Sequence, residues 1–237
     1  MVYVARDIGD DALATGQTEY NVRAMETETI EAPETRQEPS IMIVSDFVCP
    51  WCYIGLMEIE KLSQEYDFEV KLAPYLLRPE TPPEGITPRH VVPEGAPPTA
   101  TEERAEKLGI KFTRGRKWSS NSHLALQASA FAYDYGDQWR FHRAMFKAYF
   151  EDLADIGQID TVVTVGESIG MDASALRQAL EEGRYREHVD EGIAWTRGIG
   201  VTAIPTFIIN QEYGLVGAQE IEAFRSVMEK IGQPPKA

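Results

Sequence analysis

Residues 41–65 read IMIVSDFVCPWCYIGLMEIEKLSQE, and this stretch decides the fold. Its opening segment, Ile41–Phe47, is short, apolar on both faces and rich in β-branched residues, which is typical of a buried central strand. The apolar positions that follow recur near helical spacing, so we expect a helix to begin around Cys49 and Cys52. These are the chain's only two cysteines, and they stand where a buried strand gives way to a helix.

Further predicted strands and a helix complete two small units, one around the cysteines and one near the end of the chain. Residues 68–77, FEVKLAPYLL, alternate apolar and charged side chains, as a strand with one better-buried face does. Later in the chain, IPTFIIN (204–210) and EYGLVGA (212–218) are typical of strands, and residues 219–232 form an apolar stripe at helical spacing that stops at Gly232. The order is therefore β-α-β, then β-β-α, which predicts an α/β fold.

The stretch between these units differs in composition from both. We expect residues 40–78 and 199–232 to form one domain, with residues 79–198 inserted into it. The insertion begins with a loop crowded with proline and glycine, up to about Pro98. Helical patterns then continue to about residue 198, which predicts an all-helical insertion domain.

The first 39 residues have a composition of their own. They hold nine acidic residues against three arginines and show no sustained period. We expect residues 1–39 to form an acidic, flexible N-terminal extension. The alternative for its start is a short strand or helix near Val2–Ile8 that docks on the body.

Bulk properties exclude several functional classes. The 237 residues are 43% apolar, enough to bury a sizeable core, and the formal net charge is -15. Such a charge disfavours nucleic acid and anionic membrane surfaces as partners. No apolar run reaches the length of a membrane span, and the first residues do not resemble a secretory signal. We therefore expect a cytoplasmic protein, although a chain whose signal has been removed would look similar.

The cysteine pair favours redox chemistry. At a helix start, unpaired N–H groups and the positive end of the helix dipole stabilise a thiolate, which is the nucleophile of disulfide exchange. We expect Cys49, nearer the exposed helix end, to attack, and Cys52, more buried and with a higher pKa, to resolve the mixed disulfide. Pro50 suits the first helical turn, and Trp51 would be an apolar cover beside the sulfurs.

A Cys-x-x-Cys pair has two other interpretations. Zinc needs about four protein ligands, or three and a water, and none of the four histidines lies near the pair in sequence. We therefore expect no metal. A structural disulfide would close a very short loop and remove little entropy from the unfolded chain.

The segment GVTAIPTFIIN (200–210) is the second informative stretch. A bond between any residue and proline tolerates the cis form far better than other peptide bonds, and proline in a sheet is confined to strand starts and edges. If the Ile204–Pro205 bond is cis and faces the cysteines, the Ile204 backbone can pair with an extended substrate. The alternative is an ordinary trans proline that marks the start of a strand.

Taken together, residues 40–231 resemble the DsbA family of the thioredoxin superfamily. The strings SDFVCPWCYIG and GAQEIEAF are most similar to its FrnE-like branch. The resemblance implies a thioredoxin fold with a helical insertion, Cys49 as nucleophile, Cys52 as resolving residue and Pro205 as a cis-proline. It also implies that substrates lie across Ile204 and the Cys-Pro-Trp-Cys face. Periplasmic members often carry histidine where this chain has Trp51, which puts a strongly oxidising potential in doubt.

A neighbouring branch offers a second function. Glutathione-dependent isomerases of the 2-hydroxychromene-2-carboxylate type and kappa-class glutathione transferases share the layout but usually have serine at the position of Cys49. The segment NSHLAL resembles a helix start seen in both branches, which makes Asn121 and His123 candidate ligand contacts. Alternatively, Asn121 caps a helix and His123 packs on its surface.

The sequence thus predicts a thiol–disulfide oxidoreductase whose partners are protein or small-molecule disulfides and thiols. It predicts no bound cofactor, with glutathione as a candidate reductant or co-substrate, and it leaves a homodimer open. A glutathione-dependent isomerase or transferase is the first alternative. A non-enzymatic, chaperone-like binding module is the second.

Overall fold

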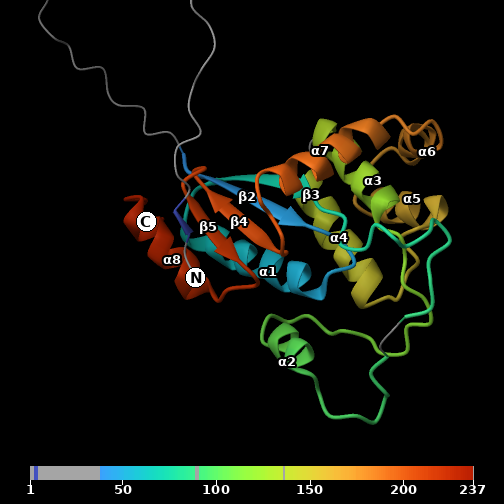
Figure 1. Cartoon of the computed structure of the whole chain (residues 1–237), viewed down its shortest axis with the longest axis horizontal. Helices are drawn as coiled ribbons and strands as arrows, with labels where there is room; N and C mark the ends of the chain where they lie inside the picture. Colours follow the sequence, from blue (N-terminus) through green and yellow to red (C-terminus); the bar gives the residue numbers. More distant parts are fainter. Residues whose placement is uncertain (1–2, 5–37, 89–90, 136, 237) are drawn as a thin grey trace, which may run out of the picture.

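The computed structural model describes residues 3–4, 38–88, 91–135 and 137–236 (Figure 1). Most of the N-terminal extension, and with it the prediction of a flexible tail, lies outside the described residues. Tyr3–Val4 form a short strand, β1, that pairs antiparallel with a strand near the C-terminus. The start of the chain therefore adds an edge strand to the body.

A five-stranded mixed sheet lies at the centre of the protein, in the order β1-β5-β4-β2-β3. Its other strands are β2 (Ser40–Ser45), β3 (Glu69–Pro74), β4 (Thr206–Ile209) and β5 (Tyr213–Val216). Strand β2 runs parallel to β3 and antiparallel to β4. Its β-branched, apolar composition fits this central position, where four of its six residues are buried and the other two are half-buried.

The register between β2 and β4 brings two distant segments together. Val44 pairs with Thr206, so the turn that precedes β4 lies beside the end of β2. The cysteines follow β2 directly, and Pro205 precedes β4 directly. The two stretches that the sequence singles out therefore meet at one end of the sheet.

Two helices pack side by side against one face of the sheet, α1 (Pro50–Glu65) and α8 (Ile221–Lys230) (Figure 1). Gly55 lets α1 approach β4, because a Cβ there would lie 2.8 Å from the Phe207 ring. The same ring packs edge-on against Phe224 of α8, with centroids 4.8 Å apart. These contacts hold the start of α1 against the turn before β4.

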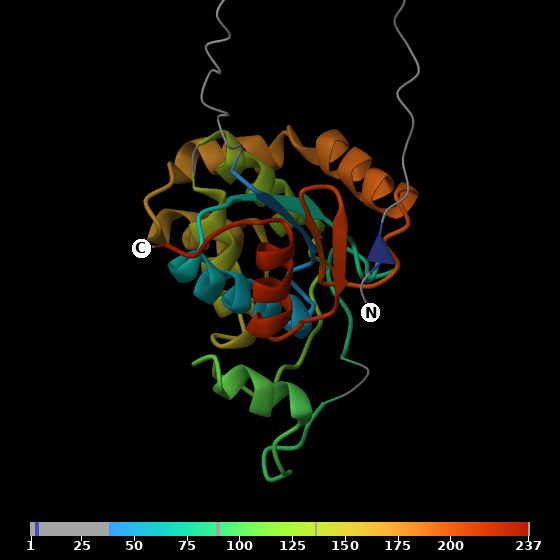
Figure 2. The same cartoon turned by 90° about the vertical axis from the view of Figure 1, so that its left-hand side faces the viewer.

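The other helices come from the predicted insertion. They are α2 (Ala100–Glu106), α3 (His123–Asp134), α4 (Gln138–Phe150), α5 (Ile159–Ser168), α6 (Ala173–Glu181) and α7 (Arg186–Gly198). Helices α3 to α6 pack on one another, and α7 packs along β3. Figures 1 and 2 both show α2 apart from this group, on the opposite side of the molecule from α7.

The prediction of helix from about residue 98 to residue 198 is wrong for residues 107–122, which contain no helix. Gly109 and Gly115 adopt φ of +74° and +89° there, a left-handed conformation that interrupts a helix. Helix α2 is tied instead to α1, through an ion pair of 2.6 Å between Arg104 and the buried Glu58. None of the described helices is long and apolar enough to cross a membrane.

Candidate active site

Cys49 occupies the N-cap of α1, and Pro50 stands in the first turn. The residue has extended backbone angles, and its own side chain does not cap the helix. Its carbonyl oxygen accepts hydrogen bonds from the N–H groups of Cys52 (3.0 Å) and Tyr53 (3.4 Å), which begins the helical ladder. The N–H groups of the first turn are left to face the Cys49 sulfur, as a helix start requires.

The two thiols are both free, and their pKa values are shifted in opposite directions. The Cys52 thiol donates to Cys49, and this hydrogen bond, with the N–H groups of Cys52 and Trp51, lowers the pKa of Cys49. Complete burial, followed by the interaction with Cys49, holds the pKa of Cys52 well above its usual range. Of the two thiols, Cys49 is therefore the one that loses its proton more readily.

Cys49 is less accessible than the sequence suggested. We expected it at the exposed helix end, but only 5% of the residue is exposed. The turn before β4 covers it, because the Cys49 sulfur lies 3.8 Å from the Ile204 carbonyl oxygen, within reach of a weak S–H···O hydrogen bond. The sequence could not foresee this cover, which comes from a segment far along the chain.

The peptide bond between Ile204 and Pro205 is cis. The Pro205 carbonyl oxygen accepts a hydrogen bond of 2.8 Å from the Gly217 N–H, which ties the turn to the end of β5. On its other side, the Pro205 ring packs near Gly55, where an added Cβ would lie 3.1 Å from the ring. The turn is therefore clamped between α1 and β5, with its Ile204 carbonyl directed at the sulfur.

Asp46 is a site residue that the sequence reasoning missed. It is fully buried between β2 and the cysteines, and its carboxylate accepts hydrogen bonds from the N–H groups of Leu77 (2.7 Å) and Val48 (3.3 Å). Burial raises the pKa of Asp46, and its negative charge raises the pKa of both cysteines. The available signal was an acidic residue inside an otherwise apolar run, three positions before Cys49.

Trp51 is only partly buried, and 37% of the residue is exposed. Leu77, whose N–H binds Asp46, is similarly exposed at 38%. Two large apolar side chains thus stand at the surface around the cysteine motif, where a substrate chain could contact them.

Asn121 and His123 are held by hydrogen bonds to several other segments of the chain. The Asn121 side chain donates to the Thr81 carbonyl oxygen and accepts from the His123 N–H (2.8 Å) at the start of α3. The His123 ring lies 2.8 Å from an Asp190 carboxylate oxygen of α7. Ser122, in the N-cap position, makes no capping hydrogen bond with its side chain. Among the described residues, these contacts fit the capping and packing interpretation.

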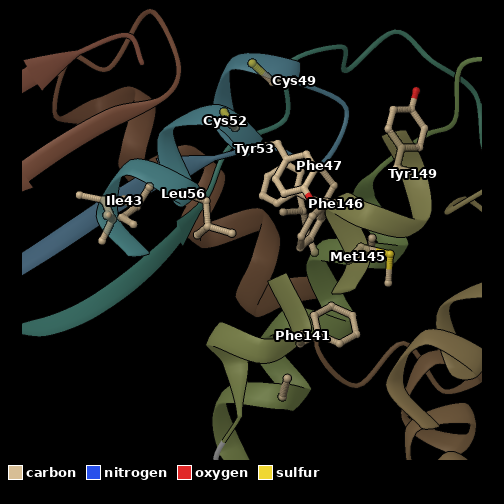
Figure 3. Close-up of a cluster of buried hydrophobic side chains, with 14 of the residues drawn as sticks. Ile43, Phe47, Cys49, Cys52, Tyr53, Leu56, Phe141, Met145, Phe146 and Tyr149 are labelled. Atoms are coloured by element: carbon tan, nitrogen blue, oxygen red, sulfur yellow. The ribbon is translucent and has the colours of Figure 1, made fainter. Parts of the chain in front are cut away.

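Aromatic side chains fill the space between α1 and α4 (Figure 3). Tyr53, directly after Cys52, stacks on Phe146 of α4 with ring centroids 5.3 Å apart, and its hydroxyl donates to Glu151 (2.7 Å). Phe47 packs against the same Phe146 ring at 5.1 Å. The residues next to the cysteines therefore pack against a cluster of aromatic rings. No cluster of three or more metal-ligating side chains occurs among the described residues.

A buried strand, a cysteine pair at a helix start and a facing cis-proline turn together define a class of protein. The chain belongs to the DSBA-like thioredoxin domain family, whose model matches residues 40–229. Both the resemblance to the DsbA family and the α/β thioredoxin fold that we predicted are thereby confirmed. The family consists in general of disulfide oxidoreductases.

Individual proteins are similar to this chain in sequence or in fold. A sequence relative is the "Uncharacterized protein YwbO" of Bacillus subtilis (strain 168), 29% identical over 171 residues, which are 71% of this chain and 86% of that one. Among solved structures, the probable DsbA oxidoreductase SCO1869 from Streptomyces coelicolor has a TM-score of 0.71 at 21% identity, covering 84% of this chain and 93% of its own. A 2-hydroxychromene-2-carboxylate isomerase has a TM-score of 0.65 at 16% identity, covering 81% and 95%. At these identities, the structures are similar in fold.

Proposed function

We propose that the chain is a thiol–disulfide oxidoreductase that works through its Cys-Pro-Trp-Cys pair. The observation that carries the proposal is the Cys49 sulfur, placed at the start of α1 and facing the Ile204 carbonyl oxygen at 3.8 Å. The lowered pKa of Cys49 and the raised pKa of Cys52 support different roles for the two thiols.

The reaction begins with the Cys49 thiolate. It attacks one sulfur of a substrate disulfide, so that a Cys49–substrate bond forms, the substrate S–S bond breaks and the other substrate sulfur leaves as a thiolate. Cys52 then loses its proton and attacks the Cys49 sulfur, which releases the second substrate thiol. The protein pair is oxidised to a disulfide, and the substrate disulfide is reduced to two thiols. The reverse sequence oxidises substrates.

Substrates would be held by the surface around the pair. The exposed Trp51 and Leu77 offer apolar contacts, and the Ile204–Pro205 turn offers a backbone edge to an extended chain. Pro50, between Cys49 and Trp51, is also part of this proposed substrate surface. Asn121 and His123 line a cavity together with Leu76, the neighbour of the exposed Leu77, and they stay candidate ligand contacts.

Alkylation by iodoacetamide across pH, followed by mass spectrometry, tests the proposal. Cys49 should react at a lower pH than an ordinary thiol, and Cys52 should stay unreactive. Insulin reduction and refolding of scrambled ribonuclease would show the direction of the activity. An unshifted Cys49 curve together with no activity in both assays would falsify the proposal.

A glutathione-dependent isomerase or transferase is the second candidate, and the shared fold with the 2-hydroxychromene-2-carboxylate isomerase favours keeping it. Calorimetric titration with glutathione separates the two. Tight non-covalent binding that survives Cys49→Ser would favour this candidate, because such enzymes activate glutathione without attacking a disulfide. Binding lost in Cys49→Ser would favour the oxidoreductase, with glutathione as its reductant.

A further inference from the structure

A cavity of about 360 Å³ lies beside the first turn of α1 and is not used by the chemistry above. Pro50 forms part of its wall, and residues 112–116, the start of α2 and Phe150 of α4 form the rest of the frame. Pro50 is joined to Cys49 by a peptide bond, which places the two Cα atoms about 3.8 Å apart. The cavity therefore begins one residue away from the nucleophile.

The segment that carries α2 builds the outer side of this cavity. In Figure 1, it lies below α1, apart from helices α3 to α6. Arg114 holds the segment together, because its guanidinium donates to backbone carbonyl oxygens within residues 93–97 of the loop before α2. The same group makes a bidentate ion pair with Glu102 of α2, with two N···O distances of 2.7 Å. One side chain thus fixes the loop and the helix start that face α1.

The charged side chains that line the cavity are already engaged. Arg114 and Glu102 neutralise one another, and Glu102 stays ionised because Arg114 lowers its pKa to about 2. Arg116 stacks on the Tyr149 ring, with its guanidinium carbon 3.6 Å from the ring centroid, and Asp155 is its counter-charge. Among the described residues of the wall, no charged group is therefore left to bind a charged occupant.

Most of the other lining residues are apolar, namely Pro50, Pro88, Val91, Val92, Phe112 and Phe150. Phe112 and Phe150 pack on one another with ring centroids 5.0 Å apart, which makes a firm apolar surface. Val91 is 55% exposed and Val92 is half-buried, so part of the wall is open to an occupant. An apolar side chain suits such a lining, whereas an unpaired charge would be costly to bury there.

The exchange reaction determines which molecule comes next to this cavity. In a mixed disulfide, the substrate sulfur is bonded to the Cys49 sulfur at about 2.05 Å, so the neighbours of the substrate cysteine must lie close to Pro50. The Ile204 carbonyl oxygen already stands on one side of the Cys49 sulfur, at 3.8 Å. A polypeptide has side chains on both flanks of its cysteine, whereas a small polar disulfide has none to place in the cavity.

We propose that this cavity receives an apolar side chain next to the reacting cysteine of a polypeptide substrate, so that Cys49 prefers cysteines with apolar neighbours. The inference rests on the proposed exchange at Cys49. The Cys49 thiolate forms a new S–S bond with the substrate cysteine, the S–S bond of the substrate breaks and its other sulfur leaves as a thiolate. The cavity binds the neighbouring side chain and takes no part in bond making.

Three uncharged probes with one leaving group test the preference. Two are tripeptides capped at both ends, whose central cysteine carries a pyridylthio group and is flanked by leucine in one and by serine in the other. The third is hydroxyethyl pyridyl disulfide. Stopped-flow absorbance records the released pyridinethiol, and each rate is divided by the rate of the same probe with dithiothreitol. The leucine probe should react about tenfold faster than the serine probe, the effect of partly burying one leucine side chain.

Variants of Val92 test whether the preference arises in the cavity. Val92→Trp fills it, and Val92→Asn makes the wall polar at nearly the same volume. Both should lower the rate of the leucine probe to that of the serine probe and leave the hydroxyethyl probe unchanged. Thr164→Trp adds the same ring to the exposed surface of α5, outside the cavity, and should leave all three rates unchanged.

The same probes distinguish the two possible failures. Absence of reaction with the hydroxyethyl probe would overturn the proposed exchange itself. If that probe reacts, equal rates for the two tripeptides with the wild type would overturn the cavity alone, as would a leucine preference that both Val92 variants keep. An equal loss of all three rates in both Val92 variants would also overturn it, because the cavity would then support the exchange site without selecting substrates.

Discussion

The sulfur of Cys49 lies 3.8 Å from the carbonyl oxygen of Ile204, a residue 155 positions further along the chain. One partner stands at the start of α1 and the other in the turn before β4, so the contact depends on the pairing of β2 with β4. The Ile204–Pro205 turn therefore covers the Cys49 sulfur and places its own backbone beside it. The predictions below test what each side of the contact contributes.

The roles of the two cysteines predict opposite outcomes for their alanine variants. Cys52→Ala should accumulate mixed disulfides on Cys49, because the resolving thiol is gone, whereas Cys49→Ala should form none. Non-reducing gels and intact-mass spectrometry measure both. Cys49→Ala should cost only about 1 kcal/mol of unfolding free energy, since it removes a single sulfur atom from a mostly buried position. Full turnover by Cys52→Ala without trapped species would show that the roles are misassigned.

Asp46 predicts a change in thiol acidity. Its negative charge raises the pKa of both cysteines, so Asp46→Asn should move the alkylation curve of Cys49 to lower pH. The amide keeps an acceptor for Leu77 but loses one of two buried acceptors, which should cost about 1–2 kcal/mol of unfolding free energy. Iodoacetamide kinetics and urea unfolding measure the two effects. A curve that stays in place or moves to higher pH would contradict the assigned electrostatics.

Gly55 predicts a packing effect at the cis-proline turn. In Gly55→Ala, the added Cβ meets the Phe207 ring at 2.8 Å and the Pro205 ring at 3.1 Å, so α1 or the turn must shift. We expect a loss of about 1–3 kcal/mol in unfolding free energy and slower exchange at Cys49. Gly198→Ala, at the end of α7 with open space around it, is the matched control and should be neutral or slightly stabilising. Equal effects of the two substitutions would refute the close packing at Gly55.

His142 predicts a pH dependence of stability. The ring is buried beside Phe47, and burial lowers its pKa to about 3 from an ordinary 6.5. Between these values the unfolded chain binds a proton that the folded chain does not, so His142 makes stability fall as pH drops from 6.5 to 3. The loss is on the order of 5 kcal/mol when complete.

Urea unfolding of the wild type and of His142→Gln, measured at several pH values, isolates this contribution. The difference in unfolding free energy between the two proteins should shift in favour of the variant as pH falls. A difference that is constant across the range would mean that folding does not lower the pKa of the ring. The Ser129 hydroxyl, 2.6 Å from the His142 ring, retains a polar partner in the glutamine variant.

Several features of the protein follow from local pattern alone. The β-branched run before the cysteines, the helical period after them and the strand with Pro205 at its start are signals within a few residues. They were enough to predict an α/β fold, and the resemblance to the DsbA family implied that this is a thioredoxin fold. The resemblance of residues 40–231 to the DsbA family rests on the same local strings. The physical reason is that backbone hydrogen bonding and side-chain period are set between near neighbours.

Other features depended on segments that meet only in the folded chain. The burial of Cys49 and the place of Asp46 close to both cysteines each result from contacts between distant segments. The tethering of Asn121 to Thr81 likewise requires two loops to meet. Local sequence determined where the helix begins and that both thiols stand at its start. Tertiary packing decided what surrounds them, because burial and charge pairing depend on distance in space.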